Sequence, residues 1–290
     1  MPEWRIEQVA DGVFARTGVN PLQPNSGIIV GDDGVLVVDS GYSAQAGREL
    51  LADIATLTPL PVTAVVISHH HFDHAWGNEV FAGAELIGHA EARRLMVEEP
   101  EPYKARMLGY TADPARWYGL SDAEMRRQME ETRITPPATT YQTRHDVAFA
   151  GPRVQLHHYG AGHTTGDTLV YLPDQRLLFA GDLVCNQVLP NAMDGDPLHW
   201  PHVLQAAGRL AIDLIVPGHG AIGDASMLRE FDGCLSTLTG EVARALDQGA
   251  PTPRAASEQL HLGDLQGWSG QELLAGSVRT LYRALERARS

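Results

Sequence analysis

Short apolar runs separated by turn residues fill the first third of the chain. Residues 28–30 and 35–38 are aliphatic, and the Gly-Asp-Asp-Gly between them is typical of a tight turn, so the pattern predicts a β-hairpin. Ser43 can then cap a helix, because apolar residues recur at helical spacing from Ala46 to Leu57. The first third is therefore expected to mix strands with helices.

The pattern changes in the middle of the chain. Between residues 91 and 135, charged and helix-forming residues replace most β-branched ones, which predicts a helical insertion over 91–135. Pro100, Pro102 and Pro114 are expected to divide this insertion into pieces, and the Thr-Pro-Pro at residues 135–137 to close it. The insertion could roof a pocket, form a dimer contact or be a plain surface excursion, and the sequence leaves these alternatives open.

Strand-like and helix-like patterns alternate again after the insertion. Apolar or alternating stretches predict strands over residues 146–150, 154–159, 168–172, 176–180 and 214–216. Helical spacing predicts helices over residues 203–210, 227–247 and 271–287. Strands, helices, strands and helices in this order predict two sheets covered by helices. The sequence shows no internal repeat, low-complexity segment or linker, so we expect one domain over residues 1–290.

The charge and cysteine content narrow the classes of function. The 290 residues include 36 acidic and 22 basic side chains, and the net charge of −14 repels polyanions, so we expect a small-molecule substrate and no nucleic acid. The acidic excess could offset bound divalent cations or serve only as a solvated surface. Cys185 and Cys234 have no paired-cysteine spacing, which favours a reduced compartment.

The hydropathy of the chain does not favour a membrane location. The longest apolar runs, such as residues 64–67, are far too short to cross a bilayer. The first residues, MPEWRIEQVADG, lack both a basic leader and an apolar segment, so no signal peptide is expected. We therefore expect no membrane contact and a cytoplasmic location. The oligomeric state stays open, and a homodimer is one option.

A cluster of metal-binding residue types follows a predicted buried strand at residues 62–67. Residues 66–78 read VISHHHFDHAWGN and place four histidines and one aspartate within six positions. Histidine nitrogens and aspartate oxygens are ligands that zinc takes in catalytic sites. In an extended chain His69 and His71 share one side and His70 points to the other, so we leave His70 out of the candidate ligands.

Five further ligand candidates follow along the chain. Asp73 and His74 lie where the strand has ended and the chain turns, which can direct them toward a second metal about 3.5–4 Å from the first. The other three stand in glycine-flanked loops after apolar strands: His163 in GAGHTTGD, Asp182 in LFAGD and His219 in IVPGHG. Glycine lets the backbone bring a ligand close to an ion. The loop after Asp182 could line a pocket or be a plain surface loop.

The order of these motifs resembles the metallo-β-lactamase superfamily. The residues that carry the resemblance are VVDSG at 37–41, His69-x-His71-x-Asp73-His74, Gly162-His163-Thr164, Gly181-Asp182 and Gly218-His219-Gly220, within a match over about residues 6–235. The resemblance implies an α+β fold, a four-layer αββα sandwich with a helical insertion, and a metal site at one edge of the two sheets.

The resemblance also implies a role for each ligand. One zinc would be held by His69, His71 and His163, a second zinc by Asp73, His74 and His219, with Asp182 bridging the two. Asp39 would be a structural aspartate that hydrogen-bonds to the ligand loop, and a plain turn-forming aspartate is the alternative. Iron or manganese can occupy the same ligand types in place of the two Zn²⁺.

Such a ligand set predicts a dinuclear zinc-dependent hydrolase. Zinc lowers the pKa of a bound water from about 15.7 toward 7, so a metal-bound hydroxide could attack a carbonyl, with Asp73 accepting its hydrogen bond. The expected substrate is an ester, lactone, thioester or cyclic amide. The best-known zinc β-lactamases carry cysteine at the position of Asp182, which argues against β-lactam hydrolysis as the main role. The alternatives are a hydroxyacylglutathione hydrolase-like thioesterase, a β-lactamase-like amidase, an iron-dependent redox enzyme and a non-catalytic metal-binding module.

Overall fold

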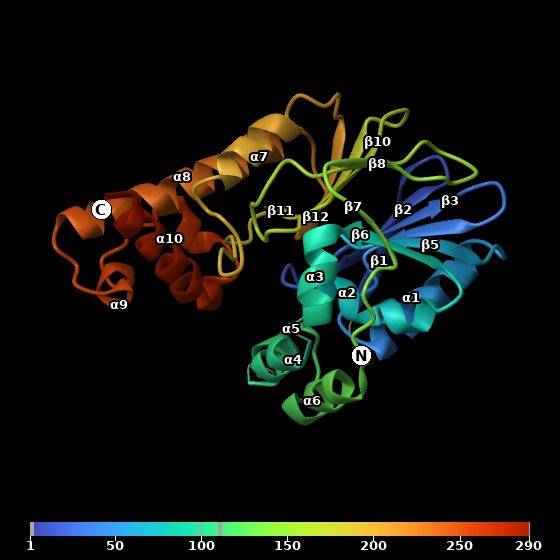
Figure 1. Ribbon diagram of the computed structural model, residues 1–290, viewed down its shortest axis with the longest axis horizontal. Coiled ribbons are helices and arrows are strands. Elements are labelled where there is room, and N and C mark those ends of the chain that lie inside the picture. Colours follow the sequence, from blue (N-terminus) through green and yellow to red (C-terminus); the bar gives the residue numbers. More distant parts are fainter. Residues whose placement is uncertain (1–2, 99, 110–111, 290) are drawn as a thin grey trace.

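Two β-sheets lie face to face in the computed structural model of the protein, which describes residues 3–98, 100–109 and 112–289 (Figure 1). The first sheet holds, in chain order, β1 (Trp4–Ala10), β2 (Val13–Gly18), β3 (Ser26–Val30), β4 (Val35–Val38), β5 (Val62–Val66), β6 (Glu85–His89) and β7 (Thr139–Tyr141). The second sheet has the order β12 (Leu214–His219), β11 (Leu177–Cys185), β10 (Leu169–Leu172), β9 (Gln155–His157) and β8 (Arg144–Asp146).

Helices connect the parallel strands and cover the outer faces of the sheets. The crossover from β4 to β5 contains α1 (Ala44–Leu57), and the crossover from β11 to β12 contains α7 (Trp200–Ala207). Parallel neighbours need such crossovers because the chain must return to the same end of the sheet. The remaining helices are α2 (Phe72–Ala75), η1 (Trp76–Phe81), α3 (Ala90–Glu98), α4 (Pro100–Leu108), α5 (Ala112–Trp117), α6 (Asp122–Glu131), α8 (Ser226–Asp247), α9 (Pro253–Ser257), η2 (Gly263–Gly267), η3 (Gln271–Leu273) and α10 (Leu274–Arg289).

The side chains of the central strands alternate between hydrophobic cores on their two faces. In β4, Val37 packs with Leu50 of α1, whereas Leu36 faces the second sheet. In β11, Leu178 packs with α7 and α8, whereas Phe179 joins Leu36 in the core between the sheets. Strands buried on both faces appear as continuous apolar runs, which is why the sequence pattern located them. The resulting layers, helix, sheet, sheet and helix, confirm the predicted αββα sandwich.

The segment predicted as a helical insertion is helical and contains α3, α4, α5 and α6 between β6 and β7. Its prolines lie at the beginnings of helices. Pro100 is the first residue of α4, but Pro102 lies in the first turn of α4 and Pro114 in the first turn of α5. Proline is tolerated in a first turn because the N–H groups there have no partner within the helix. The three prolines thus lie where α4 and α5 begin, and the described part of the insertion is divided into separate helices, as predicted.

Several strand boundaries differ from the prediction. The strand predicted over residues 146–150 instead covers residues 144–146 as β8, where His145 pairs with Leu156 of β9. Because β8 is an edge strand of polar residues, the apolar pattern carries little signal for it. The strand β11 continues to Cys185, because it pairs with β12 as far as His219. The pattern also does not predict β1, β2, β6 and β7.

The helices at the carboxyl end of the chain form a hydrophobic cluster of their own, on the far side of the second sheet (Figure 1). Leu238 and Val242 of α8 belong to this cluster together with Val278 and Leu281 of α10. The helix predicted over 271–287 begins as η3 and continues as α10. One domain over the whole chain stays a prediction. Within the described part of the chain, none of the helices has the length and apolar content needed to span a membrane.

The core between the sheets should respond strongly to the loss of Phe179, which is 2% exposed. A Cβ on Gly27 would overlap the Phe179 ring, so the two sheets approach closely there. We expect Phe179→Ala to lower the free energy of unfolding by about 3–5 kcal/mol, because it leaves a cavity in a packed core. Urea denaturation followed by circular dichroism measures this. Val97→Ala, at a side chain that is 51% exposed, is the control, and equally small effects of both variants would contradict the packing.

Candidate metal centre

The seven ligand candidates meet at one edge of the sandwich. The histidine loop follows β5, the Gly-His-Thr loop precedes β10, Asp182 lies within β11, and His219 ends β12. Groups of three candidates have ligand atoms within 4.8 Å of one another: His69, His71 and His163; Asp73, His74 and His219; and His69, His74 and Asp182. The fold therefore brings together residues as distant in the chain as His74 and His219, which are 145 positions apart.

A buried aspartate positions the histidine loop. Asp39 accepts a hydrogen bond from the Ser68 backbone N–H at 2.6 Å and another from the Ser68 hydroxyl at 2.7 Å. Its Oδ2 atom also lies 2.8 Å from His74 Nδ1. Asp39 has a φ of 62°, in the left-handed region that few residues other than glycine adopt. These three contacts confirm the predicted bond between Asp39 and the ligand loop, and a plain turn would not require them.

The first group consists of three buried imidazoles. His163 Nε2 lies 3.2 Å from His69 Nε2 and 2.9 Å from His71 Nδ1. Nitrogens that bind one zinc tetrahedrally at about 2.0–2.1 Å are about 3.3 Å apart. The spacing and the donor type of this group therefore fit a single zinc ion.

The second group contains a carboxylate and two imidazoles. His219 Nε2 lies 3.4 Å from His74 Nε2 and 3.3 Å from Asp73 Oδ2. The third separation, between His74 Nε2 and Asp73 Oδ2, is 3.8 Å. These distances also fit one ion, and the carboxylate makes this group more negative than the first.

Asp182 lies between the two groups. Its Oδ2 atom is 3.4 Å from His163 Nε2, and its Oδ1 atom is 3.1 Å from His74 Nε2 and 3.4 Å from His219 Nε2. Gly218 leaves the room for this arrangement, because a Cβ there would overlap Asp182 Oδ1. A carboxylate that directs one oxygen toward each group has the geometry of a ligand shared by two ions.

The second ring nitrogen of most of these histidines has a partner of its own. Besides the contact of His74 with Asp39, the partners are Ser68 Oγ for His69 Nδ1 at 3.0 Å, Asp194 Oδ2 for His71 Nε2 at 3.1 Å, and the Asn191 carbonyl for His163 Nδ1 at 2.8 Å. Such partners set the tautomer and leave the other nitrogen for a metal. Sequence reasoning did not identify Asn191 or Asp194. Its only signal was the position of their loop directly after Asp182.

Burial and neighbouring charge affect the two groups differently. In the first group, burial lowers the pKa of His163 to about 4 even though Asp182 opposes this, and burial with three neighbouring imidazoles lowers the pKa of His69 well below its usual value. In the second group, burial would lower the pKa of both histidines, but Asp182 and Asp73 outweigh it. The pKa of His74 is raised well above its usual value and that of His219 to about 9. Without a metal, the second group thus holds protons that balance its carboxylates.

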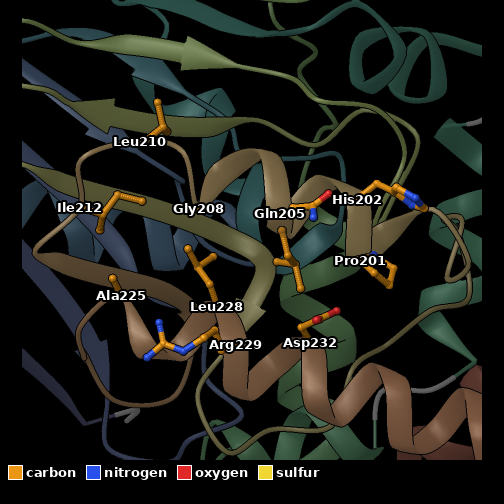
Figure 2. Close-up of a pocket in the computed structure, with 11 residues that line it drawn as sticks. Pro201, His202, Gln205, Gly208, Leu210, Ile212, Ala225, Leu228, Arg229 and Asp232 are labelled. Atoms are coloured by element: carbon orange, nitrogen blue, oxygen red, sulfur yellow. The ribbon is translucent and has the colours of Figure 1, made fainter.

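A cavity of about 340 Å³ lies beside the first group. It is lined by the ligand loop, α3, α4 and the loop after Asp182, with His70, Trp76, Met96, Tyr103, Arg106 and Asp194 among its residues. His70 therefore faces this cavity and belongs to neither triad. A larger hollow of about 540 Å³ lies between α7 and α8 (Figure 2). None of the seven ligand candidates lines either space, but Asp194, which contacts His71, lines the smaller cavity. The smaller cavity is therefore the one that adjoins the candidate ligands.

Comparison with known proteins agrees with this geometry. A family model described as the metallo-beta-lactamase superfamily matches residues 19–219. The chain is 27% identical over 220 residues to a linear primary-alkylsulfatase of Pseudomonas sp. (strain ATCC 19151), covering 67% of this chain but only 40% of that protein. It is 25% identical over 235 residues to the metallo-beta-lactamase type 2 of Bacillus cereus, covering 77% of this chain and 79% of that protein. Among solved structures, a metallo-beta-lactamase from Pontibacter korlensis has a similar fold, with a TM-score of 0.65, 24% identity, and coverage of 81% of this chain and 99% of that one.

Zinc binding should release protons from the second group at neutral pH. His219, with a pKa of about 9 in the metal-free protein, is protonated at pH 7 and must become neutral to bind zinc. We therefore expect the apparent zinc affinity to rise as the pH increases from 7 toward 9. Calorimetric titration in two buffers with different ionisation enthalpies counts the protons released. An affinity that is constant over this pH range, with no proton release at pH 7, would contradict the charge balance.

Proposed function

This chain belongs to the metallo-β-lactamase superfamily, and on that premise we propose that it is a dinuclear zinc-dependent hydrolase that acts on a carbonyl group of a small molecule. The curated relatives include enzymes named as a metallo-β-lactamase and an alkylsulfatase, which supports a metal-dependent hydrolase. The chain spans only 40% of the alkylsulfatase, so that similarity supports the reaction class more than the substrate.

The observation that carries the proposal is the position of Asp182. Each of its oxygens lies within 3.4 Å of a histidine nitrogen from a different triad. A single ion would need only one triad and one carboxylate oxygen. Two triads on opposite sides of a shared carboxylate support a pair of ions, with His69, His71 and His163 for one and Asp73, His74 and His219 for the other.

The donor set also supports zinc. Five imidazoles and two carboxylates suit zinc, although iron and manganese accept the same ligands. When bound, a zinc pair supplies Lewis-acid polarisation of the substrate and lowers the pKa of a coordinated water toward 7. No serine or cysteine nucleophile is then needed, in agreement with Cys185, which is buried and has its pKa raised well above the usual value by burial.

Asp73 has two tasks in this proposal. Its Oδ2 atom lies with the second triad, 3.3 Å from His219 Nε2. In this proposal its carboxylate would also accept a hydrogen bond from the attacking water and so orient a lone pair toward the carbonyl carbon. Burial opposes its ionisation, but His74 and His219 outweigh this and lower the pKa of Asp73, so the carboxylate stays an acceptor at neutral pH.

The cavity beside His71 supports a small, partly apolar substrate. Leu95, Met96 and Ile134 form apolar parts of its wall, and Tyr103 and Trp76 add aromatic surface. Its volume of about 340 Å³ lies at the low end of the range for ligand pockets. Esters, lactones, thioesters and cyclic amides of that size are the proposed substrates, and the net charge of −14 argues against nucleic acid.

The similarity to an alkylsulfatase favours a second candidate function, the hydrolysis of a sulfate ester. The same zinc pair could stabilise negative charge on sulfate oxygens as well as on a carbonyl oxygen. The two candidates differ in the bond that is cleaved, so substrates distinguish them directly.

A substrate panel tests the proposal. Metal content of the purified protein is measured first, and the protein reconstituted with zinc, iron or manganese is assayed on lactones, acyl thioesters, β-lactams, alkyl sulfates and phosphodiesters. We expect two zinc ions per chain and zinc-dependent turnover of a carbonyl substrate. Turnover that requires oxygen would favour an iron redox enzyme, and tight binding without turnover would favour a non-catalytic module.

Replacing Asp73 by asparagine tests its second task. Asp73→Asn keeps an oxygen near the second triad but weakens the acceptor, so we expect kcat to fall by about 10²–10⁴-fold. Asp174→Asn is the matched control, because Asp174 pairs with Arg153 at a surface-exposed position. Steady-state kinetics on the best substrate of the panel measures both variants. Unchanged kcat in Asp73→Asn with both metals bound would rule out this role.

A further inference from the structure

A chain of contacts links the helical insertion to the first triad. His71 offers Nδ1 to the triad, and its Nε2 atom lies 3.1 Å from Asp194 Oδ2. Arg106 of α4 donates to both oxygens of the same carboxylate, from Nη1 to Oδ1 at 3.1 Å and from Nη2 to Oδ2 at 2.8 Å. Asp194 Oδ2 therefore accepts from a ligand histidine and from the insertion at once.

A second residue of α4 contacts the same loop. The Tyr103 hydroxyl accepts a hydrogen bond from the Phe72 backbone N–H at 3.2 Å, and its ring lies parallel to the His71 ring with centroids 6.2 Å apart. Arg106 lies over the Tyr103 ring, 5.0 Å from its centroid. Because positions three apart share one face of a helix, α4 presents both side chains to the ligand loop.

The backbone around Asp194 is held against the Gly-His-Thr loop. Asp194 forms a parallel bridge with Thr164, and the Asp196 N–H donates to the Gly162 carbonyl at 3.0 Å. Gly195 fits closely there, because a Cβ on it would overlap the carbonyl oxygens of Gly162 and His163. The backbone that carries the Asp194 side chain is therefore held in a fixed position relative to the first triad.

We propose that Asp194 and Arg106 are positioning residues for the metal ligand His71. Asp194 keeps the proton on Nε2, which leaves the Nδ1 lone pair for the metal, and Arg106 holds the carboxylate of Asp194 in place from α4. The insertion is thereby part of the metal centre. This inference rests on the proposed function only in requiring that the first triad binds a metal.

A cation held by His70, His71 and Asp194 is the competing explanation, because their ligand atoms also lie within 4.8 Å of one another. Two features argue against it. Both Asp194 oxygens already accept hydrogen bonds from the Arg106 guanidinium, whose charge would repel a cation. In addition, His71 would need to bind ions through both nitrogens, one of them in the first triad.

Zinc competition titration against a chromophoric chelator, without substrate, tests the proposal. We expect Asp194→Ala to weaken one of the two zinc sites by about 10–100-fold and to leave the other unchanged. Asp194→Asn should weaken it less, because an amide oxygen still accepts from Nε2–H. Arg106→Ala should also weaken that site, and Arg106→Lys should restore part of the affinity. Arg176→Ala is the control, since Arg176 also makes a two-bond pair with an aspartate, at 2.7 and 2.8 Å to Asp213 at the surface.

Cobalt substitution supplies a second readout that a merely structural role would not change. In the Co²⁺-loaded protein, the Nε2 proton of His71 should give a hyperfine-shifted NMR signal that disappears in D₂O. We expect this proton to exchange faster in Asp194→Ala and Asp194→Asn than in the wild-type protein. Asp194→Asn keeps the shape of the side chain, so its proton exchange tests the role of Asp194 even if Asp194→Ala does not fold.

The outcomes separate this inference from the proposed function. Unchanged zinc affinities and proton exchange in both Asp194 variants would overturn the inference even if the protein is a hydrolase. The expected changes together with no turnover on any panel substrate would leave the inference standing and overturn the proposed function. A third zinc bound by the wild-type protein and lost in Asp194→Ala would overturn the inference in favour of the competing cation site.

Discussion

The burial of negative charge at one edge of the sandwich constrains everything around it. Asp39, Asp73 and Asp182 have side chains that are 4%, 13% and 9% exposed, and buried carboxylates are costly unless cations or hydrogen-bond donors surround them. The protein surrounds Asp39 with donors, and it surrounds the other two with imidazoles. Protons on His74 and His219 can balance the charge without metal, and a pair of divalent ions balances it with metal.

The fold meets this constraint by placing strand ends from both sheets together. The ligand loop follows a strand of the first sheet, whereas Asp182 and His219 belong to neighbouring parallel strands of the second. Asp182 and His219 lie on strands that are rigid elements of the scaffold, which favours a preorganised centre. These strand ends lie so close together that position 218 has room only for glycine, because the Cβ of a larger residue would overlap Asp182.

The insertion and the loop after Asp182 form the surroundings of the candidate metal centre. They supply most of the wall of the adjoining cavity, and they also supply Asp194 and the Asn191 carbonyl, which contact His71 and His163. The segments that wall this cavity are therefore the same ones that contact two of the candidate ligands.

The sequence by itself indicated two sheets covered by helices and the candidate ligands through local signals, and it indicated the αββα sandwich through its resemblance to the superfamily. Buried central strands appear as apolar runs, and the spacing His69-x-His71-x-Asp73-His74 is visible within one loop. Only the tertiary structure decided which residues support those ligands. Asp194 lies 123 positions from His71, and Asn191 acts through its backbone carbonyl, so neither has a pattern in its own neighbourhood that indicates the contact. Local periodicity records which face of a strand or helix is buried, whereas a hydrogen bond between distant loops depends on how the layers pack.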